Sequence, residues 1–175
     1  MAITKNKLVK EFQNWGKAFK VEFTIKVTKL PTKTWTNVFH FTANNGDRET
    51  YGDRIPGLWI HNSGNFYVCS AVSGITDYAK FVNLELGKEH QMTIQQLLEV
   101  DSDQGTSRYW YEIILDGESK FLIENRQPKS FANVKLYASD PWYEPFSSDL
   151  GHVCIINTIS RDFQSFLDLS GDWAL

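Results

Sequence analysis

Five aspartates lie in the polar stretches between apolar segments, and they are the side chains best suited to hold an ion. They are Asp47, Asp53, Asp77, Asp101 and Asp103, and Asn44 and Asn45 precede the first of them. Calcium prefers carboxylate and amide oxygens, so the sequence predicts a calcium site if the fold brings these residues together. No spaced calcium motif such as an EF-hand loop is present. The alternative is that these residues form ordinary turns, in which Asp and Asn side chains bond to nearby backbone.

Two other short segments could bind an organic ligand. Asp53 and Arg54 form one candidate, because a loop guanidinium can present a fork of donors to a carboxylate or a sugar hydroxyl. Asp140, Trp142 and Tyr143 form the other, because flat aromatic rings can hold the apolar face of a sugar. In the structural alternative, the first pair fixes a long loop and the second stabilises a turn at Pro141.

A third segment suggests catalysis. Glu99-Val-Asp101-Ser-Asp103 places three carboxyl groups on one face if the strand continues, as in some glucanases that hydrolyse glycosidic bonds with paired carboxylates. Asp103 stands where such a strand would carry a glutamate, and a Gly-containing turn signal follows at 104–107. A strand that runs into a hairpin loop is therefore the preferred interpretation, and a glucanase-like hydrolase using Glu99 and Asp101 is the enzymatic alternative.

Several classes of function find no support in the sequence. The four histidines are scattered without metal-ligand spacing, and no nucleotide-binding loop or serine-hydrolase elbow is present. The formal net charge of -3 gives no broad cationic surface, which argues against a nucleic-acid partner. No apolar run is long enough to span a membrane, and the amino end has no apolar signal-peptide core.

The elements that would position these residues are strands. Phe19, Val21, Phe23, Ile25 and Val27 alternate with polar residues, which is typical of a half-buried strand whose apolar side points inward. Similar patterns predict strands at 35–43, 55–61, 66–72, 80–86, 90–100, 109–115, 120–125, 131–138 and 153–158. Glycine-containing turns at 62–65, 86–89 and 116–119 favour hairpins between them. The sequence therefore predicts an all-β, two-sheet antiparallel sandwich over residues 1–160.

The last fifteen residues, 161–175, are expected to form a separate tail. Phe163, Phe166 and Leu167 recur at helical spacing, so we expect a short helix or an extended segment. The tail either packs back on the sandwich or docks elsewhere, and docking on a second copy would make an oligomer. Cys69 and Cys154 lie in apolar strand segments and are either two buried free thiols or one bridge between an early and a late strand.

The order of strands also predicts where the loops lie. Successive antiparallel strands place their connections alternately at the two ends of a sandwich. Loops 44–54, 73–79, 101–107 and 126–130 are then expected at one end, together with all five aspartates. Loops 62–65, 87–89, 116–119 and 139–151 are expected at the other end.

Three segments carry a family resemblance: Thr36-Asn-Val-Phe-His-Phe-Thr42, Tyr51-Gly-Asp-Arg-Ile-Pro56 and the run from Asn133 to Tyr143. Over residues 8–158 the chain resembles extracellular repeat domains of marine animals that are related to concanavalin A-like sandwiches of the laminin-G, pentraxin and galectin type. The resemblance implies a jelly roll, an extracellular location, and a role in adhesion or ligand recognition, often with calcium. The relatives carry adjacent cysteines where this chain has Asn45-Gly-Asp-Arg-Glu-Thr50, so that disulfide is absent here.

These observations predict a non-catalytic binding module that recognises a glycan or a protein through loops at one end of the sandwich, with calcium as the candidate cofactor. Two alternatives stay open at this point. One is the glucanase-like hydrolase, and the other is a self-assembling structural subunit that uses its tail.

Overall fold

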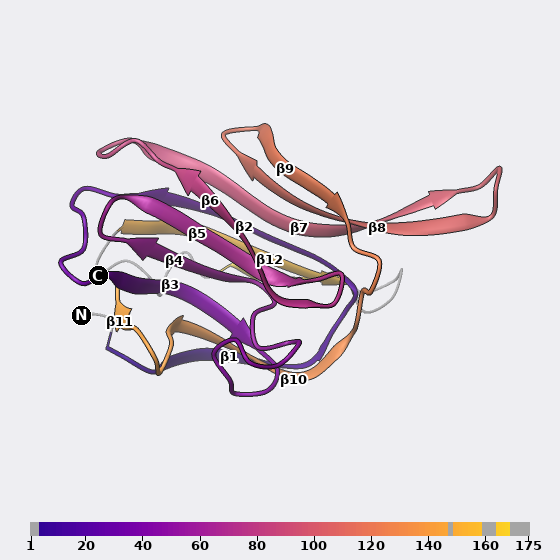
Figure 1. Ribbon diagram of the computed structural model, residues 1–175, viewed down its shortest axis with the longest axis horizontal. Coiled ribbons are helices and arrows are strands. Elements are labelled where there is room, and N and C mark those ends of the chain that lie inside the picture. The colour runs from indigo at the N-terminus through magenta and orange to yellow at the C-terminus, as the bar shows by residue number, and fades with distance from the viewer. Residues whose placement is uncertain (1–3, 147–148, 159–163, 169–175) are drawn as a thin grey trace.

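The computed structural model describes residues 4–146, 149–158 and 164–168, and in these ranges the protein is built from strands without a helix. Two sheets pack face to face, as Figure 1 shows. No helix in the described part of the chain has the length and apolar character needed to cross a membrane.

The first sheet, sheet A, has the strand order β1-β10-β3-β4-β5-β6, and the short β11 pairs in parallel with β3. Its strands are β1 (Lys7–Trp15), β10 (Phe131–Ser139), β3 (Trp35–Thr42), β4 (Gly57–His61), β5 (Asn65–Val72), β6 (Ile75–Asn83) and β11 (Glu144–Pro145). All neighbours other than β11 and β3 are antiparallel.

The second sheet, sheet B, has the order β13-β12-β2-β7-β8-β9 and is antiparallel throughout. Its strands are β13 (Gln164–Asp168), β12 (Asp149–Thr158), β2 (Ala18–Lys26), β7 (Glu89–Asp101), β8 (Thr106–Leu115) and β9 (Glu118–Glu124). The fold class expected from the sequence is therefore confirmed.

The core lies between the two sheets and includes the predicted face of β2. Phe19, Val21, Phe23, Ile25 and Val27 are each at most 5% exposed, so the predicted inward direction of this face is confirmed. Phe23 packs edge to face on Phe39 of sheet A, with ring centroids 5.2 Å apart. This pair joins the two sheets across the centre of the sandwich.

One expected hairpin differs from the structure, and one strand was not predicted. The glycine turn at 86–89 was expected to form a hairpin, but it carries the chain from β6 in sheet A to β7 in sheet B. Strand β1 has few apolar residues in alternation and carries no strong pattern, yet it pairs with β10 from Lys7 to Trp15. Tertiary pairing outweighs weak local patterning in this segment.

The end of the chain is extended where the structure describes it. Gln164–Asp168 forms β13 and pairs with β12, so of the two expected alternatives the helix is wrong over these residues. Its apolar residues recur at helical spacing, but backbone pairing with β12 holds the segment in an extended conformation. Residues 159–163 and 169–175 lie outside the described part, and the role of the tail in self-assembly stays a prediction.

Strands β7 and β8 extend beyond the body of the sandwich as a two-stranded ribbon, which we call the β7–β8 arm (residues 97–109) (Figure 1). Strand β2 pairs with β7 only as far as Gln96, and β9 pairs with β8 only from Trp110 onward. Leu97, Leu98 and Val100 on the arm are therefore about half exposed.

Candidate functional site

The candidate site lies on the outer face of sheet A, the face turned away from sheet B. Leu58 and Ile60 of β4 belong to the core, so Trp59 between them points outward. Tyr67 of β5 is paired with Trp59 and shares this direction. Gly57 permits the indole of Trp59 to lie along the strand, because a Cβ at this position would collide with the ring.

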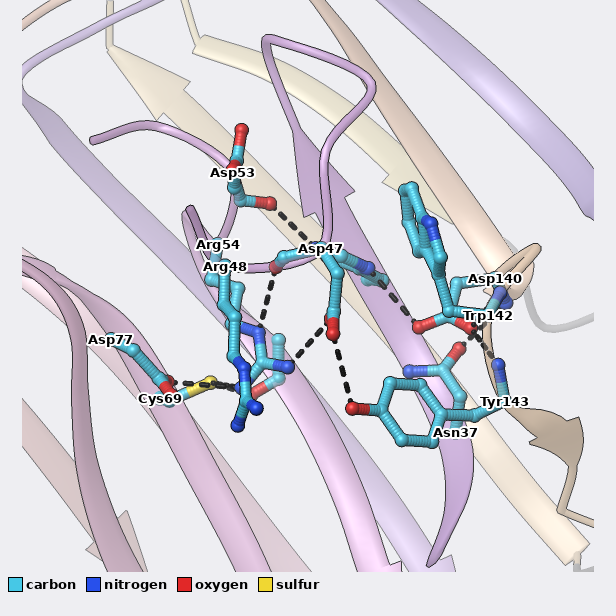
Figure 2. A network of polar contacts seen from close by, with 12 residues as sticks. Asn37, Asp47, Arg48, Asp53, Arg54, Cys69, Asp77, Asp140, Trp142 and Tyr143 are labelled. Carbon is cyan, nitrogen blue, oxygen red and sulfur yellow. Dashed lines mark hydrogen bonds and ion pairs between the residues drawn. The ribbon is translucent and has the colours of Figure 1, made fainter. Parts of the chain in front are cut away.

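Two connecting segments fold over this outer face and cover Trp59, which is only 1% exposed. One is the loop 43–56 between β3 and β4, and the other is the segment 140–146 after β10 (Figure 2). The guanidinium carbon of Arg54 lies 4.1 Å from the centroid of the Trp59 ring. The ring of Tyr143 also packs against Trp59, with the two ring centroids 6.0 Å apart.

Arg54 is the central polar side chain of the site and is 3% exposed. Its Nη2 donates to Oδ1 of Asp47 at 2.6 Å, and its Nη1 donates to Oδ1 of Asp77 at 2.9 Å. Its Nε donates to the backbone oxygen of Asp47 at 2.9 Å. Arg54 thus ties its own loop to strand β6 beneath it.

The charge of Arg54 is stable in this environment. Burial lowers the pKa of Arg54, but the hydrogen bond to Asp47 and the charges of both carboxylates raise it above the usual arginine value. The adjacent thiol of Cys69 is neutral, because burial raises its pKa well above the usual value. Cys69 is a free thiol, so the alternative of a bridge to Cys154 is wrong.

Two tyrosines complete the network around Arg54. The hydroxyl of Tyr143 donates to Oδ2 of Asp47 at 3.1 Å, and the hydroxyl of Tyr67 donates to Oδ2 of Asp77 at 3.0 Å. Each carboxylate therefore accepts from Arg54 through one oxygen and from a tyrosine through the other. Figure 2 shows the Tyr143 and Arg54 contacts meeting at Asp47.

A second network holds the two covering segments together beside the first. The ring of His40 lies between Oδ2 of Asp140 at 3.2 Å and the backbone oxygen of Asp53 at 2.5 Å. Oδ1 of Asp140 accepts from the backbone N–H groups of Trp142 and Tyr143. His40 and Asp140 are fully buried, so this contact fixes where Tyr143 is presented.

The networks surround a pocket of about 130 Å³ on the outer face. Its lining residues are Trp35, Arg48, Arg54, Trp59, Tyr67 and Tyr143. The floor is aromatic and hydrogen-bonded, while Trp35 and Tyr67 are only half-buried and Arg48 is exposed. A flat, partly apolar molecule with a few polar substituents matches this lining.

The two ligand-binding segments predicted from the sequence meet in this structure. Arg54 and Tyr143 both line the pocket and are joined through Asp47. Asp53 and Asp140 are buried, and their carboxylates accept hydrogen bonds from backbone N–H groups. Asp53 accepts from the N–H of Thr50 at 2.7 Å. Trp142 is half-buried beside His40, at 5.5 Å between ring centroids. The role of these residues in ligand binding stays a prediction.

The five predicted calcium ligands are not gathered in one place. Asp47 and Asp77 converge on Arg54, whose guanidinium offsets their charges. Asp101 and Asp103 lie at the tip of the β7–β8 arm, away from the loop 43–56 (Figure 1). The expected convergence of all five acids is therefore wrong, because the arm extends past the body of the sandwich. Within the described residues, no three His, Cys, Asp or Glu side chains are arranged to hold a metal ion.

Only two of the three carboxylates of the predicted catalytic strand, Glu99 and Asp101, lie on a strand. Strand β7 ends at Asp101, so Asp103 lies in the turn and not on the strand face. Asp101 accepts from the backbone N–H groups of Asp103 and Gln104, which is the turn role considered above. Glu99 accepts from the indole N–H of Trp110 at 2.7 Å. Glu99, Asp101 and Arg108 line an exposed cavity of about 400 Å³ on the arm.

Four pocket residues were not identified from the sequence. Trp35, Trp59 and Tyr67 lie in strands whose residues are buried on both faces, so alternation does not show which of them point outward. Arg48 lies in a polar loop and has no distinctive neighbours in sequence. The only available signal is the density of aromatic residues on three consecutive strands.

The site makes a prediction for alkaline pH. Burial, together with the nearby carboxylates, raises the pKa of Tyr67 and of Tyr143 above the ordinary tyrosine value of about 10. Both therefore contribute stability that is fully present below about pH 10 and is lost as the pH rises through their folded-state values. A spectrophotometric titration counts the tyrosines that ionise above the usual pH range. The Tyr67→Phe, Tyr143→Phe double variant should show two fewer of them than the unmodified protein. Unchanged ionisation in that variant would contradict this assignment.

Comparison with known proteins identifies the fold. No family model and no curated protein matches this chain. A heptameric SAP-like pentraxin from Limulus polyphemus is similar in structure, with a TM-score of 0.55 and 11% identity over 97% of this chain and 91% of the pentraxin. An alginate lyase from Pseudomonas aeruginosa matches with a TM-score of 0.51 and 12% identity, over 83% of this chain and 68% of the lyase.

A second alginate lyase, A1-II′, has a TM-score of 0.50 and 14% identity, over 83% of this chain and 65% of that chain. The chain therefore has the concanavalin A-like jelly-roll sandwich fold that the sequence resemblance implied. This fold carries both a pentraxin and lyases, so it does not by itself decide between binding and catalysis.

Proposed function

We propose that this concanavalin A-like domain is a non-catalytic binding module that recognises a glycan on the outer face of sheet A. The observation that supports it is a row of aromatic rings across four strands of that face: Trp35, His61, Tyr67 and Phe81. Trp35 contacts His61 at 4.7 Å and Tyr67 at 5.4 Å between ring centroids. Tyr67 contacts Phe81 at 5.3 Å, and Phe81 is 63% exposed.

This row is suited to a sugar chain for a physical reason. Sugar rings present an apolar face of C–H groups that packs on aromatic rings, while their hydroxyls keep contact with water and polar groups. An exposed aromatic row beside a pocket with a hydrogen-bonded floor offers both kinds of contact. The proposed site lies on the face of a sheet, whereas the sequence analysis predicted binding through loops at one end of the sandwich.

The proposal predicts loss of binding when the row is interrupted. Trp35→Ala is expected to weaken glycan binding at least about tenfold, because a central aromatic anchor contributes on the order of 2 kcal/mol. The measurement is titration against immobilised oligosaccharides that the unmodified protein retains. Leu122→Ala, at an exposed apolar residue of sheet B, is the matched control and should bind normally. If Trp35→Ala and Leu122→Ala bind the oligosaccharides equally well, there is no glycan site on this face. The same conclusion follows if the unmodified protein binds only protein ligands.

The hydrolase alternative rests on the cavity that Glu99 and Asp101 line on the arm. Glu99→Gln should abolish hydrolysis of β-glucans if that cavity is catalytic. Cleavage by the unmodified protein that disappears in Glu99→Gln would replace the binding proposal with an enzymatic one.

Assembly and location are further parts of the proposal. Size-exclusion chromatography with and without residues 161–175 tests self-assembly through the tail, because a monomeric binder keeps its elution volume. The extracellular location implied by the resemblance, and calcium as a cofactor, stay predictions. A thermal melt at millimolar calcium tests the latter, because an ion that binds only the folded state raises the melting temperature.

A further inference from the structure

The pocket has a floor whose charges are already paired. Arg54 donates from all three of its nitrogens to Asp47 and Asp77. Both oxygens of each carboxylate are used as well, because Tyr143 and Tyr67 donate to the oxygens that Arg54 leaves free. These five side chains form a closed set, so a ligand would gain little from displacing any member of it.

Arg48 is the exception among the charged residues that line this pocket. Its side chain is exposed and has no hydrogen bond or ion pair to any described residue. The adjacent Glu49 binds the backbone N–H of Arg48 at 3.1 Å and does not line the pocket. Figure 2 shows Arg48 on the same loop as Asp47, Asp53 and Arg54, and Arg48 lines the pocket together with Arg54.

The pocket therefore combines aromatic surface with one positive charge that has no counterion among the residues that the structure describes. A guanidinium forms two parallel hydrogen bonds to a carboxylate or to a sulfate, and such charge-assisted bonds are stronger than those to neutral hydroxyls. Trp35 and Tyr67 line the same pocket as Arg48 and supply the surface for a ring. One molecule that carries a ring and an oxyanion together would satisfy both features.

We propose that the site takes an acidic glycan, whose sugar ring packs on Trp35 and Tyr67 and whose carboxylate or sulfate group binds the guanidinium of Arg48. This inference rests on the proposed glycan-binding function and specifies its substrate class. Arg48 is the residue that discriminates acidic from neutral sugars, and the aromatic residues bind both.

The test compares glycans that differ only in charge. The probes are glucose oligomers, the same oligomers oxidised at C6 to glucuronate, and the same oligomers sulfated at O6. We expect the unmodified protein to prefer an acidic series, and the series it prefers distinguishes carboxylate from sulfate. Arg48→Gln should weaken binding of that series by about 10- to 100-fold, as for the loss of a hydrogen bond to a charged group, and leave the neutral series unchanged. Arg48→Lys should restore part of the loss.

Two controls separate this inference from the function on which it rests. Arg108→Gln removes an exposed arginine of the arm and should leave both series unchanged. Trp35→Ala should weaken the acidic and the neutral series alike. Binding of neutral and acidic oligomers with equal affinity, or equal loss of both in Arg48→Gln, would overturn the acidic-glycan inference while the glycan-binding function stands. Failure of the unmodified protein to bind any series would overturn both.

Discussion

Replacing Arg54 with methionine is expected to lower the free energy of unfolding by about 3 kcal/mol, the lower end of the range for breaking a buried ion pair. Methionine keeps an apolar stem against Trp59 but leaves Asp47 and Asp77 without their common partner. The two carboxylates are 15% and 19% exposed, and this residual contact with water is why we choose the lower end. Urea denaturation monitored by tryptophan fluorescence measures the change.

Two further variants show whether the loss comes from unpaired charge. Arg108→Met on the arm should change stability by less than about 0.5 kcal/mol, as is usual for exposed positions. Adding Asp47→Asn and Asp77→Asn to Arg54→Met should recover part of the loss, because the variant then carries no unpaired carboxylate there. A cost below about 1 kcal/mol for Arg54→Met alone would show that Arg54 does not hold the loop 43–56 on sheet A.

Phe23→Ala is expected to cost about 3–5 kcal/mol of stability, as large-to-small changes of buried aromatic residues do. Phe23 is 1% exposed and contacts Phe39 of the other sheet, so the cavity would lie between the sheets. Thr24→Ala on the outward side of the same strand is the control and should be nearly neutral. Chemical denaturation of both variants gives the comparison, and a loss below about 1 kcal/mol for Phe23→Ala would mean that the core tolerates the cavity.

The sandwich could be predicted because its clearest strands bury one face only. In β2 every second residue is buried, so the sequence shows both the strand and its direction. In β3 all residues after Trp35 are buried, because sheet B covers one face and the two connecting segments cover the other. A continuous apolar run predicts a strand but does not show which of its residues form the outer face. The same holds for β4, so the sequence did not identify Trp59 as an outer-face residue.

The candidate site was predicted only in part, for a related reason. Loop parity describes connections that stay at the ends of strands. It holds for the loop that carries Tyr51, whose hydroxyl lies within hydrogen-bond distance of the backbone oxygens of Ala71 and Gln127. The segment 140–146 instead turns back along β3, and the loop 43–56 folds over the same face. Asp47 and Tyr143 therefore meet although parity assigned them to opposite ends.

The pairing of early with late strands has a consequence for how the protein is made. Strand β2 lies between β7 and β12, and the backbone N–H of Gly16 donates to the side chain of Asn157, 141 residues further along the chain. Strand β1 likewise pairs with β10, which is synthesised more than 100 residues later. During synthesis on the ribosome, sheet A cannot be completed until β10 has emerged and sheet B cannot be completed until β12 has emerged, so β2 lacks one of its two neighbouring strands until then. We therefore expect the nascent chain to depend on chaperones until β12 has emerged from the ribosome, and the purified protein to refold slowly for its size.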